Sequence, residues 1–102
     1  MLPMYQNNNL EGVDMKNRIQ VERIQTGMRI EKRMVKVLKA LAEYLDMTLG
    51  DLIEGIVLHA FDGKAPFNDQ TLKKIKEIKK VYDLDLDSTH SHKLAEFTSR
   101  SS

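Results

Sequence analysis

The sequence contains no cysteine, no tryptophan and only two prolines in 102 residues. Without cysteine there are no disulfides, no Cys-ligated zinc and no thiol nucleophile, which agrees with a reducing compartment. No apolar run approaches the roughly 18 to 20 residues that a membrane-spanning helix requires. The first residues also lack the basic start and the apolar core of a signal peptide. These absences predict a cytoplasmic protein that does not interact with a membrane.

Features of catalysis and metal binding are absent too. No nucleophile stands beside a base and no glycine-rich loop is suited to cradle a phosphate, so we expect no enzyme activity. His90 and His92 are separated by one residue, but no third ligand follows at a matching spacing. We therefore expect neither a metal nor a cofactor.

Charge is distributed unevenly along the chain, although 16 basic and 15 acidic residues nearly cancel. Residues 16–39 hold eight basic residues against two acidic ones, whereas residues 40–62 hold five acidic residues and no Lys or Arg. A basic block beside an acidic one indicates a surface that faces a polyanion. The alternative is a charged helix face that contacts only solvent.

The hydrophobic pattern changes its period along the chain. Apolar and polar side chains alternate over residues 23–30, which predicts a strand with one apolar face. Apolar residues then recur at helical spacing over residues 31–46 and 48–62, and a third helical pattern follows residue 68. Thr48 can cap the second of these helices and Asn68 the third. The apolar stripe of the first helix consists of Met34, Val35, Leu38, Leu41, Ala42 and Leu45, and that of the third consists of Leu72, Ile75, Ile78 and Tyr82. The second of these patterns is so rich in apolar residues that we expect burial on more than one side.

These patterns also divide the chain into regions. Residues 1–17 have no period and are expected to form a flexible arm, and residues 98–102 a disordered tail. We expect residues 18–63 to form the folded domain and residues 64–97 to form a helical extension.

The single strand has no partner within the chain. A unit of about 40 residues without disulfide or metal rarely has enough core to fold alone. A symmetric homodimer, or a higher oligomer, solves both problems when two copies of the strand pair antiparallel over the helices. The fold class that we predict is mostly α, with this intermolecular ribbon. Its dimer core comprises Met28, Ile30, Leu38, Leu41, Leu52, Ile53, Ile56 and Val57.

Three segments resemble the ribbon-helix-helix family of DNA-binding proteins. They are Gly-Met-Arg-Ile-Glu at 27–31, Leu-Lys-Ala-Leu-Ala-Glu at 38–43 and Thr-Leu-Gly-Asp-Leu-Ile at 48–53. The resemblance covers roughly residues 23–62 and departs from the family at Glu31, where proline is common. It implies an intertwined homodimer with a two-stranded antiparallel ribbon, to which this chain adds an extra C-terminal helix.

The resemblance also implies which residues touch double-stranded DNA. In the family the ribbon enters the major groove, which here assigns base contacts to Arg23, Gln25 and Arg29. Arg can donate two hydrogen bonds to guanine, and Gln can pair with adenine. Gly27 would allow the backbone to approach the bases closely. Phosphate contacts are expected from Lys32, Arg33, Thr48, Leu49 and Gly50.

Two functions from different classes follow. The first is a sequence-specific DNA-binding dimer, acting as a transcriptional repressor or a bacterial, plasmid-type maintenance regulator. The alternative is an antitoxin-like protein-binding module, in which residues 64–97 hold a protein partner.

Overall fold

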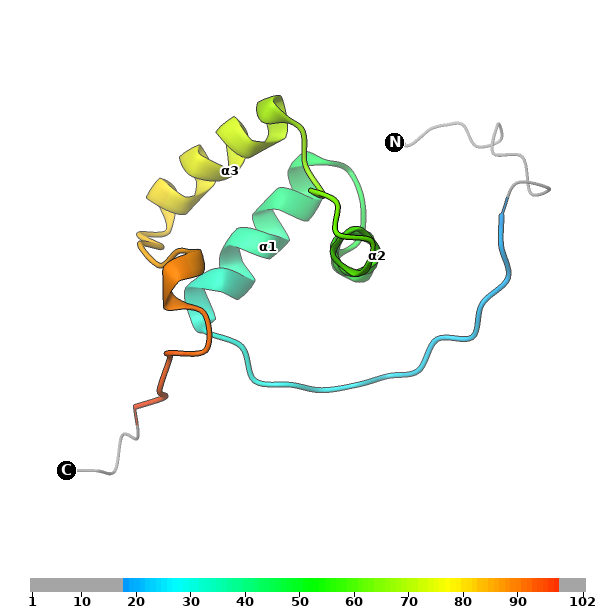
Figure 1. The fold of residues 1–102 in the computed structure, drawn as a ribbon, viewed down its shortest axis with the longest axis horizontal. Coiled ribbons are helices and arrows are strands. Elements are labelled where there is room, and N and C mark those ends of the chain that lie inside the picture. The colour runs from blue at the N-terminus through cyan, green and yellow to red at the C-terminus, as the bar shows by residue number, and fades with distance from the viewer. Residues whose placement is uncertain (1–17, 98–102) are drawn as a thin grey trace.

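The computed structural model describes residues 18–97, which contain three α-helices and one short 3-10 helix (Figure 1). The elements are α1 (Lys32–Tyr44), α2 (Leu49–Phe61), α3 (Asp69–Val81) and η2 (Ser88–His90). All three predicted helices are confirmed. Among these residues no helix has the length and apolar character needed to cross a membrane. The flexible arm and the disordered tail predicted at the two ends lie outside the described residues.

Each α-helix begins after a side chain that caps it. Glu31, Thr48 and Asn68 each accept a hydrogen bond from the backbone N–H three residues further on. Such a bond satisfies one of the amides that the first turn of a helix leaves without a partner. The sequence predicted the caps at Thr48 and Asn68, whereas Glu31 performs the same task where the resembling family commonly has proline.

The helix α1 lies at the centre of the fold, with α2 packed on one side and α3 on the other (Figure 1). The core forms where Leu41 and Ala42 of α1 meet Leu52 of α2. Partly buried side chains of α1 and its C-cap, of α2 and α3, and of the loop between α2 and α3 pack around it: Leu38, Leu45, Ile56, Phe67, Ile75 and Ile78. Because α1 is covered on two sides, it also buries Val37, which lies outside the predicted apolar stripe.

Two lysine–tyrosine contacts connect α1 and α3. Lys36 Nζ lies 5.9 Å from the ring centroid of Tyr82, and Lys74 Nζ lies 5.1 Å from the ring centroid of Tyr44. Lys36 lies in the first half of α1 and Tyr82 directly follows α3, whereas Lys74 lies in the first half of α3 and Tyr44 ends α1. The two contacts thus lie at opposite ends of the helix pair. The helices therefore run antiparallel, and a cation–π contact holds each end.

The predicted ribbon-helix-helix fold is wrong. The described part of the chain, residues 18–97, contains no strand, and so no β-ribbon. Residues 18–30, here called the extended segment, run as an open trace from the described N-terminal end to α1 (Figure 1). An alternating pattern becomes a β-strand only where a second strand accepts its backbone hydrogen bonds. The described chain offers no such strand, so the alternation of residues 23–30 does not produce one.

Candidate nucleic-acid interface

The extended segment carries the predicted base-contacting residues on an exposed stretch of chain. Arg23 is held by α2, because its Nε and Nη2 atoms donate to Glu54 Oε2 and Oε1 at 2.7 and 2.8 Å. Two parallel bonds of this kind fix the plane of a guanidinium group as well as its position. The Arg23 side chain nevertheless remains 67% exposed, so this pair lies at the surface.

Arg29 makes the same type of contact with a different part of the chain. Its Nε donates to Glu96 Oε1 at 3.1 Å, and its Nη2 donates to Glu96 Oε2. Glu96 lies beyond η2, near the end of the described residues. Arg23 thus connects the extended segment to α2, and Arg29 connects it to the segment after η2.

The first turn of α2 offers backbone donors beside Arg23. Thr48 Oγ1 accepts from the Asp51 amide at 3.1 Å, whereas the amides of Leu49 and Gly50 have no hydrogen-bond acceptor within the described residues. No atom lies within 4 Å of the position that a Gly50 Cβ would occupy, so the surface there is open. Free amides at the positive end of a helix dipole are suited to hold a phosphate. The Asp51 carboxylate weakens that preference because it adds a negative charge.

The Arg23 pair and the α2 N-terminus lie on one side of the molecule. Glu54 follows Gly50 by four residues, and residues four apart share a face of a helix. The charge of Asp51 also contributes to raising the pKa of Arg23, although the hydrogen bonds that Arg23 donates to Glu54 contribute most. The structure therefore brings one predicted base-contacting residue close to the predicted phosphate site.

Gln25 and Gly27 lie between the two anchored arginines, and both are exposed. No atom lies within 4 Å of the position of a Gly27 Cβ. The backbone is therefore open to close approach at this point. The contacts predicted for these two residues stay predictions.

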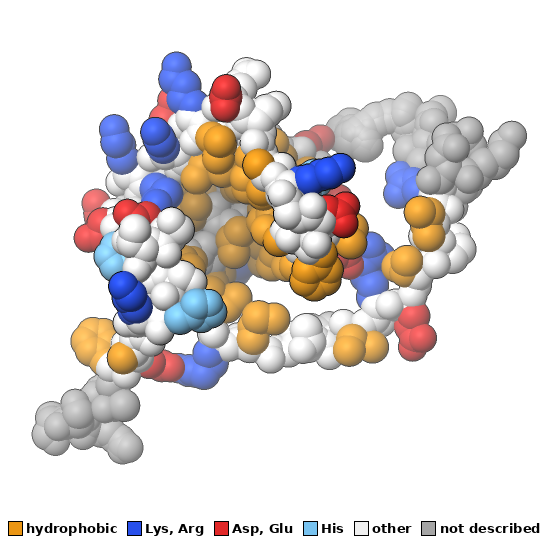
Figure 2. Space-filling model, in the orientation of Figure 1, with side chains coloured by type: hydrophobic (Ala, Val, Ile, Leu, Met, Phe, Trp, Pro, Cys, Tyr) orange, Lys and Arg blue, Asp and Glu red, His pale blue; other side chains and the backbone are white. Residues whose placement is uncertain are grey.

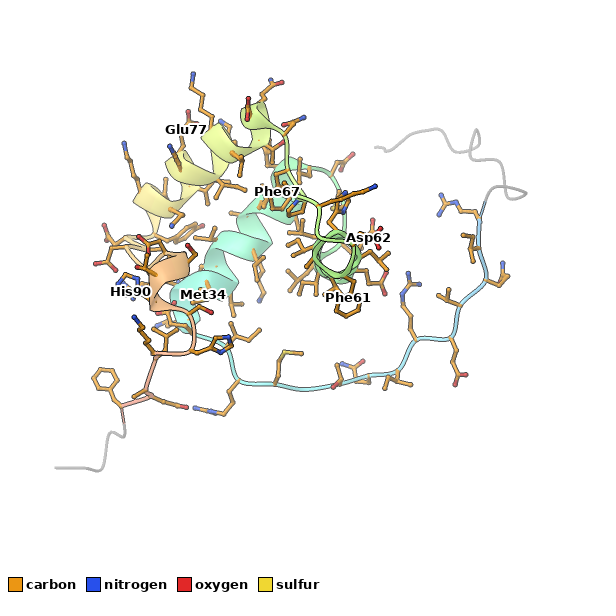
Figure 3. All side chains as sticks on the ribbon, viewed as in Figure 1. Met34, Phe61, Asp62, Phe67, Glu77 and His90 are labelled. Atoms are coloured by element: carbon orange, nitrogen blue, oxygen red, sulfur yellow. The ribbon has the colours of Figure 1, made fainter. Side chains whose placement is uncertain are left out.

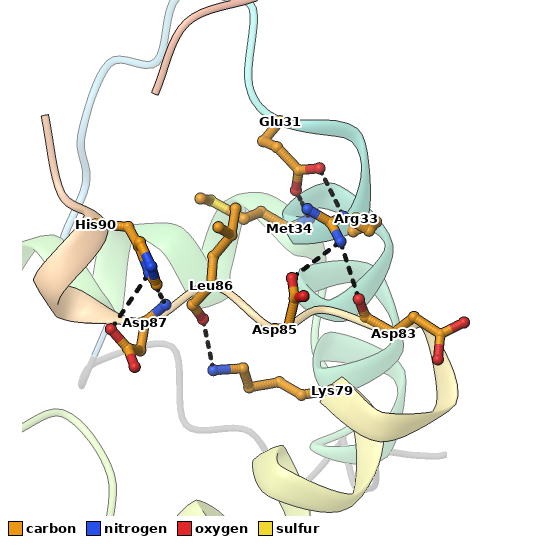
Figure 4. Close-up of polar contacts among 9 residues, drawn as sticks. All are labelled: Glu31, Arg33, Met34, Lys79, Asp83, Asp85, Leu86, Asp87 and His90. Carbon is orange, nitrogen blue, oxygen red and sulfur yellow. Dashed lines mark hydrogen bonds and ion pairs between the residues drawn. The ribbon is translucent and has the colours of Figure 1, made fainter. Parts of the chain in front are cut away.

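The Arg33 side chain donates hydrogen bonds to other residues of the chain, whereas the neighbouring Lys32 is exposed. Its Nε donates to Glu31 Oε2 at 2.8 Å, and its Nη1 donates to the Asp83 carbonyl oxygen at 2.9 Å and to Asp85 Oδ1 at 3.2 Å (Figure 4). These contacts join the start of α1 to the segment that follows α3. Lys32 is thus better placed for the predicted phosphate contact than Arg33.

Each of these ion pairs shifts the pKa of both its members. Hydrogen bonds from Arg23 and Arg29 lower the pKa of Glu54 and Glu96, respectively, and raise the pKa of each arginine in return. Charge-assisted bonds favour the ionised form of both partners. The two ion pairs therefore persist throughout the neutral range.

The predicted dimer core is divided between the interior of the single chain and its surface. Leu41 and Leu52 are buried, and Leu38, Ile53 and Ile56 are partly buried. Exposed members of the set are Met28, Ile30 and Val57. Burial of α2 on more than one side, expected from its sequence, is not found within the single chain.

No protein-family model, curated protein or solved structure matches this chain. The site is therefore interpreted from its own geometry. Sequence reasoning missed Glu54 and Glu96, which lie 31 and 67 residues from the arginines that they hold. No spacing rule connects residues so far apart, and only the folding of the chain brings them together.

Proposed function

We propose that this chain is a sequence-specific DNA-binding protein that acts as a homodimer in transcription regulation, as a repressor or a plasmid-type maintenance regulator. The observation that carries the proposal is the position of Arg23 beside the first turn of α2. A guanidinium group there can reach a base edge while the amides of Leu49 and Gly50 hold the neighbouring phosphate. Base contacts and phosphate contacts then come from one exposed surface.

The extended segment supplies the base-contacting side chains. Arg29 and Gln25 join Arg23 in recognising guanine and adenine, each contact contributing roughly 1–3 kcal/mol of discrimination. Lys32 follows directly after this segment and adds a phosphate contact from the start of α1.

The homodimer is supported by apolar side chains that the single chain leaves uncovered. Leu58 and Phe61 are 65% and 82% exposed, and they lie three residues apart on one face of α2 together with Val57. Figure 2 shows hydrophobic side chains on this part of the surface. A face of this kind on a small domain marks an interaction site. In the proposed dimer a second copy of α2 covers the C-terminal half of this face, which leaves Glu54, nearer the N-terminus of the helix, in contact with Arg23.

The proposal is tested by selecting bound sequences from random duplex DNA, followed by measurements of affinity for the selected site. We expect Arg29→Ala to weaken specific binding by about tenfold or more, since it removes a bidentate base contact. Lys76→Ala removes the same charge from an exposed position on α3, and we expect a much smaller loss. Equal losses from the two variants would place the DNA on another surface.

Salt dependence separates this function from a second candidate, a module that binds a protein partner through residues 64–97. That candidate is favoured by Leu94 and Phe97, which are exposed beyond η2. DNA binding through phosphate contacts weakens steeply between about 50 and 200 mM salt. Flat binding over this range, or no binding, would support the protein partner.

A further inference from the structure

Both arginines proposed to contact bases are held through the same two atoms. Glu54 accepts from Nε and Nη2 of Arg23, and Glu96 accepts from Nε and Nη2 of Arg29. In each case the carboxylate lies along the side of the guanidinium group. The two carboxylates come from different elements, α2 and the segment after η2, yet they produce the same geometry.

This geometry leaves the end edge of each guanidinium group open. A guanidinium group has five N–H donors in a fixed plane, and a carboxylate bound to Nε and Nη2 occupies two of them. Both hydrogens of Nη1 and the outer hydrogen of Nη2 stay available. That edge can donate two parallel bonds to O6 and N7 of guanine. The arginine side chains are 67% and 82% exposed, so ligands have access to them from solvent.

We propose that Glu54 and Glu96 are positioning residues for DNA recognition, which orient Arg23 and Arg29 so that their end edges face guanine. This inference rests on the proposed function. A long arginine side chain otherwise samples many rotamers and loses that freedom when it binds. A carboxylate that holds the guanidinium plane beforehand reduces this loss. It thereby strengthens the contact with guanine more than the contact with any other base.

The opposite role, in which the carboxylates compete with DNA for the arginines, has a different signature. A competing carboxylate weakens binding to every sequence, because it blocks the positive charge itself. A positioning carboxylate also repels phosphates, but it increases the difference between the correct sequence and a random one. The ratio of specific to non-specific affinity therefore separates the two roles.

The experiment measures this ratio for the full chain and for Glu54→Gln and Glu96→Gln, on the selected site and on a random duplex at one salt concentration. Glu22→Gln is the matched control, because Glu22 lies on the same exposed segment and makes no ion pair within residues 18–97. We expect the ratio to fall about fivefold or more in each test variant and to stay within about twofold of wild type in the control. Exposed ion pairs contribute little to stability, so unchanged helical circular dichroism verifies the fold of each variant.

A second measurement uses DNA in which the guanines of the selected site are replaced by 7-deazaguanine, which lacks the N7 acceptor. We expect this replacement to weaken wild-type binding and to have a smaller effect on Glu54→Gln and Glu96→Gln. If these carboxylates had a merely structural role, 7-deazaguanine would cause the same loss of affinity in the variants as in wild type. Ratios equal to that of Glu22→Gln, or a general gain in affinity with an unchanged ratio, would overturn the inference alone. A wild-type chain that does not discriminate between sequences would overturn the proposed function as well.

Discussion

Glu31 shows how one side chain can both begin a helix and hold the arginine that reaches a distant segment. Its Oε1 accepts from the Met34 amide at 2.9 Å, and its Oε2 accepts from Arg33 at 2.8 Å. The hydrogen bond from Arg33 lowers the pKa of Glu31, and the bond from the Met34 amide adds to this effect, whereas desolvation opposes it. The ionised form of Glu31 is therefore the form that the folded chain prefers.

This preference predicts how stability changes with pH. A carboxyl group whose pKa is lower in the folded chain stabilises it fully above the unfolded pKa, here about 4.5, and less as pH falls through the folded value. We expect Glu31→Gln to reduce the decline in Tm between about pH 5 and 2. Thermal unfolding followed by circular dichroism at several pH values measures this.

Glu43→Gln is the matched control for that measurement. Glu43 is exposed on α1 and makes no ion pair within residues 18–97. Its removal should leave the acid-induced decline in Tm close to that of wild type. An equal change in both variants would show that the net charge of the protein, and not the contact between Glu31 and Arg33, causes the pH dependence.

At the scale of the elements, the segment after α3 is attached to the start of α1 through Arg33. Within this segment the backbone hydrogen bonds are local. The Leu84 N–H donates to the Lys79 carbonyl oxygen at 2.9 Å, and η2 forms one short turn. Lys79 Nζ also donates to the Leu86 carbonyl oxygen at 2.8 Å (Figure 4). Arg33 ties residues 83–85 of this segment to the start of α1, because its donors reach Asp83 and Asp85.

We therefore expect Arg33→Lys to loosen the segment while α1 remains helical. A lysine has a single ammonium group and cannot hold Glu31 and Asp85 in one rigid fork. Hydrogen exchange at the Leu84 and His90 amides should become faster by about two- to fivefold, because exposed ion pairs contribute only modestly to stability. Lys32→Gln, a change at the adjacent exposed position, should leave these rates unchanged. Unchanged rates in Arg33→Lys would contradict this role for Arg33.

At the scale of the whole molecule, the central position of α1 explains why so much apolar surface remains uncovered. The helices α2 and α3 each pack against α1, and each keeps a side that contacts no other described helix. Figure 3 shows Phe61 projecting from α2 on the side where the extended segment runs. Phe61 and Leu58 remain largely exposed as a result.

If a second copy covers this face, a charge placed there will prevent association. We expect wild type to sediment as a dimer at micromolar concentration and Phe61→Asp to sediment as a monomer. Phe97→Asp is the matched control, because Phe97 is 90% exposed but lies beyond η2 and away from α2. A wild-type monomer, or the same behaviour in both variants, would contradict the proposed dimer.

Local patterns predicted the helices well because capping and helical periodicity act over a few residues. Thr48 and Asn68 accept the amide bonds expected of them, and Leu41 and Leu52 are buried as their spacing predicted. The same reasoning placed Leu72 on the buried stripe of the third helix, yet Leu72 is 44% exposed. The periodicity identifies the apolar face of α3, but it does not show how much of that face a neighbour covers, and α1 is the only described helix that packs against α3.

The sequence alone determined the three helices, the caps of the second and third, and the uneven charge, since each depends on residues close together in the chain. It also indicated a strand, and here it was wrong, because a strand requires hydrogen bonds from a second strand that the described chain lacks. Only the tertiary structure decided which carboxylates hold Arg23 and Arg29, which side of α2 stays exposed and that Arg33 anchors residues 83–85. These outcomes depend on contacts between residues that are distant in the sequence, and such contacts leave no periodic signal in it.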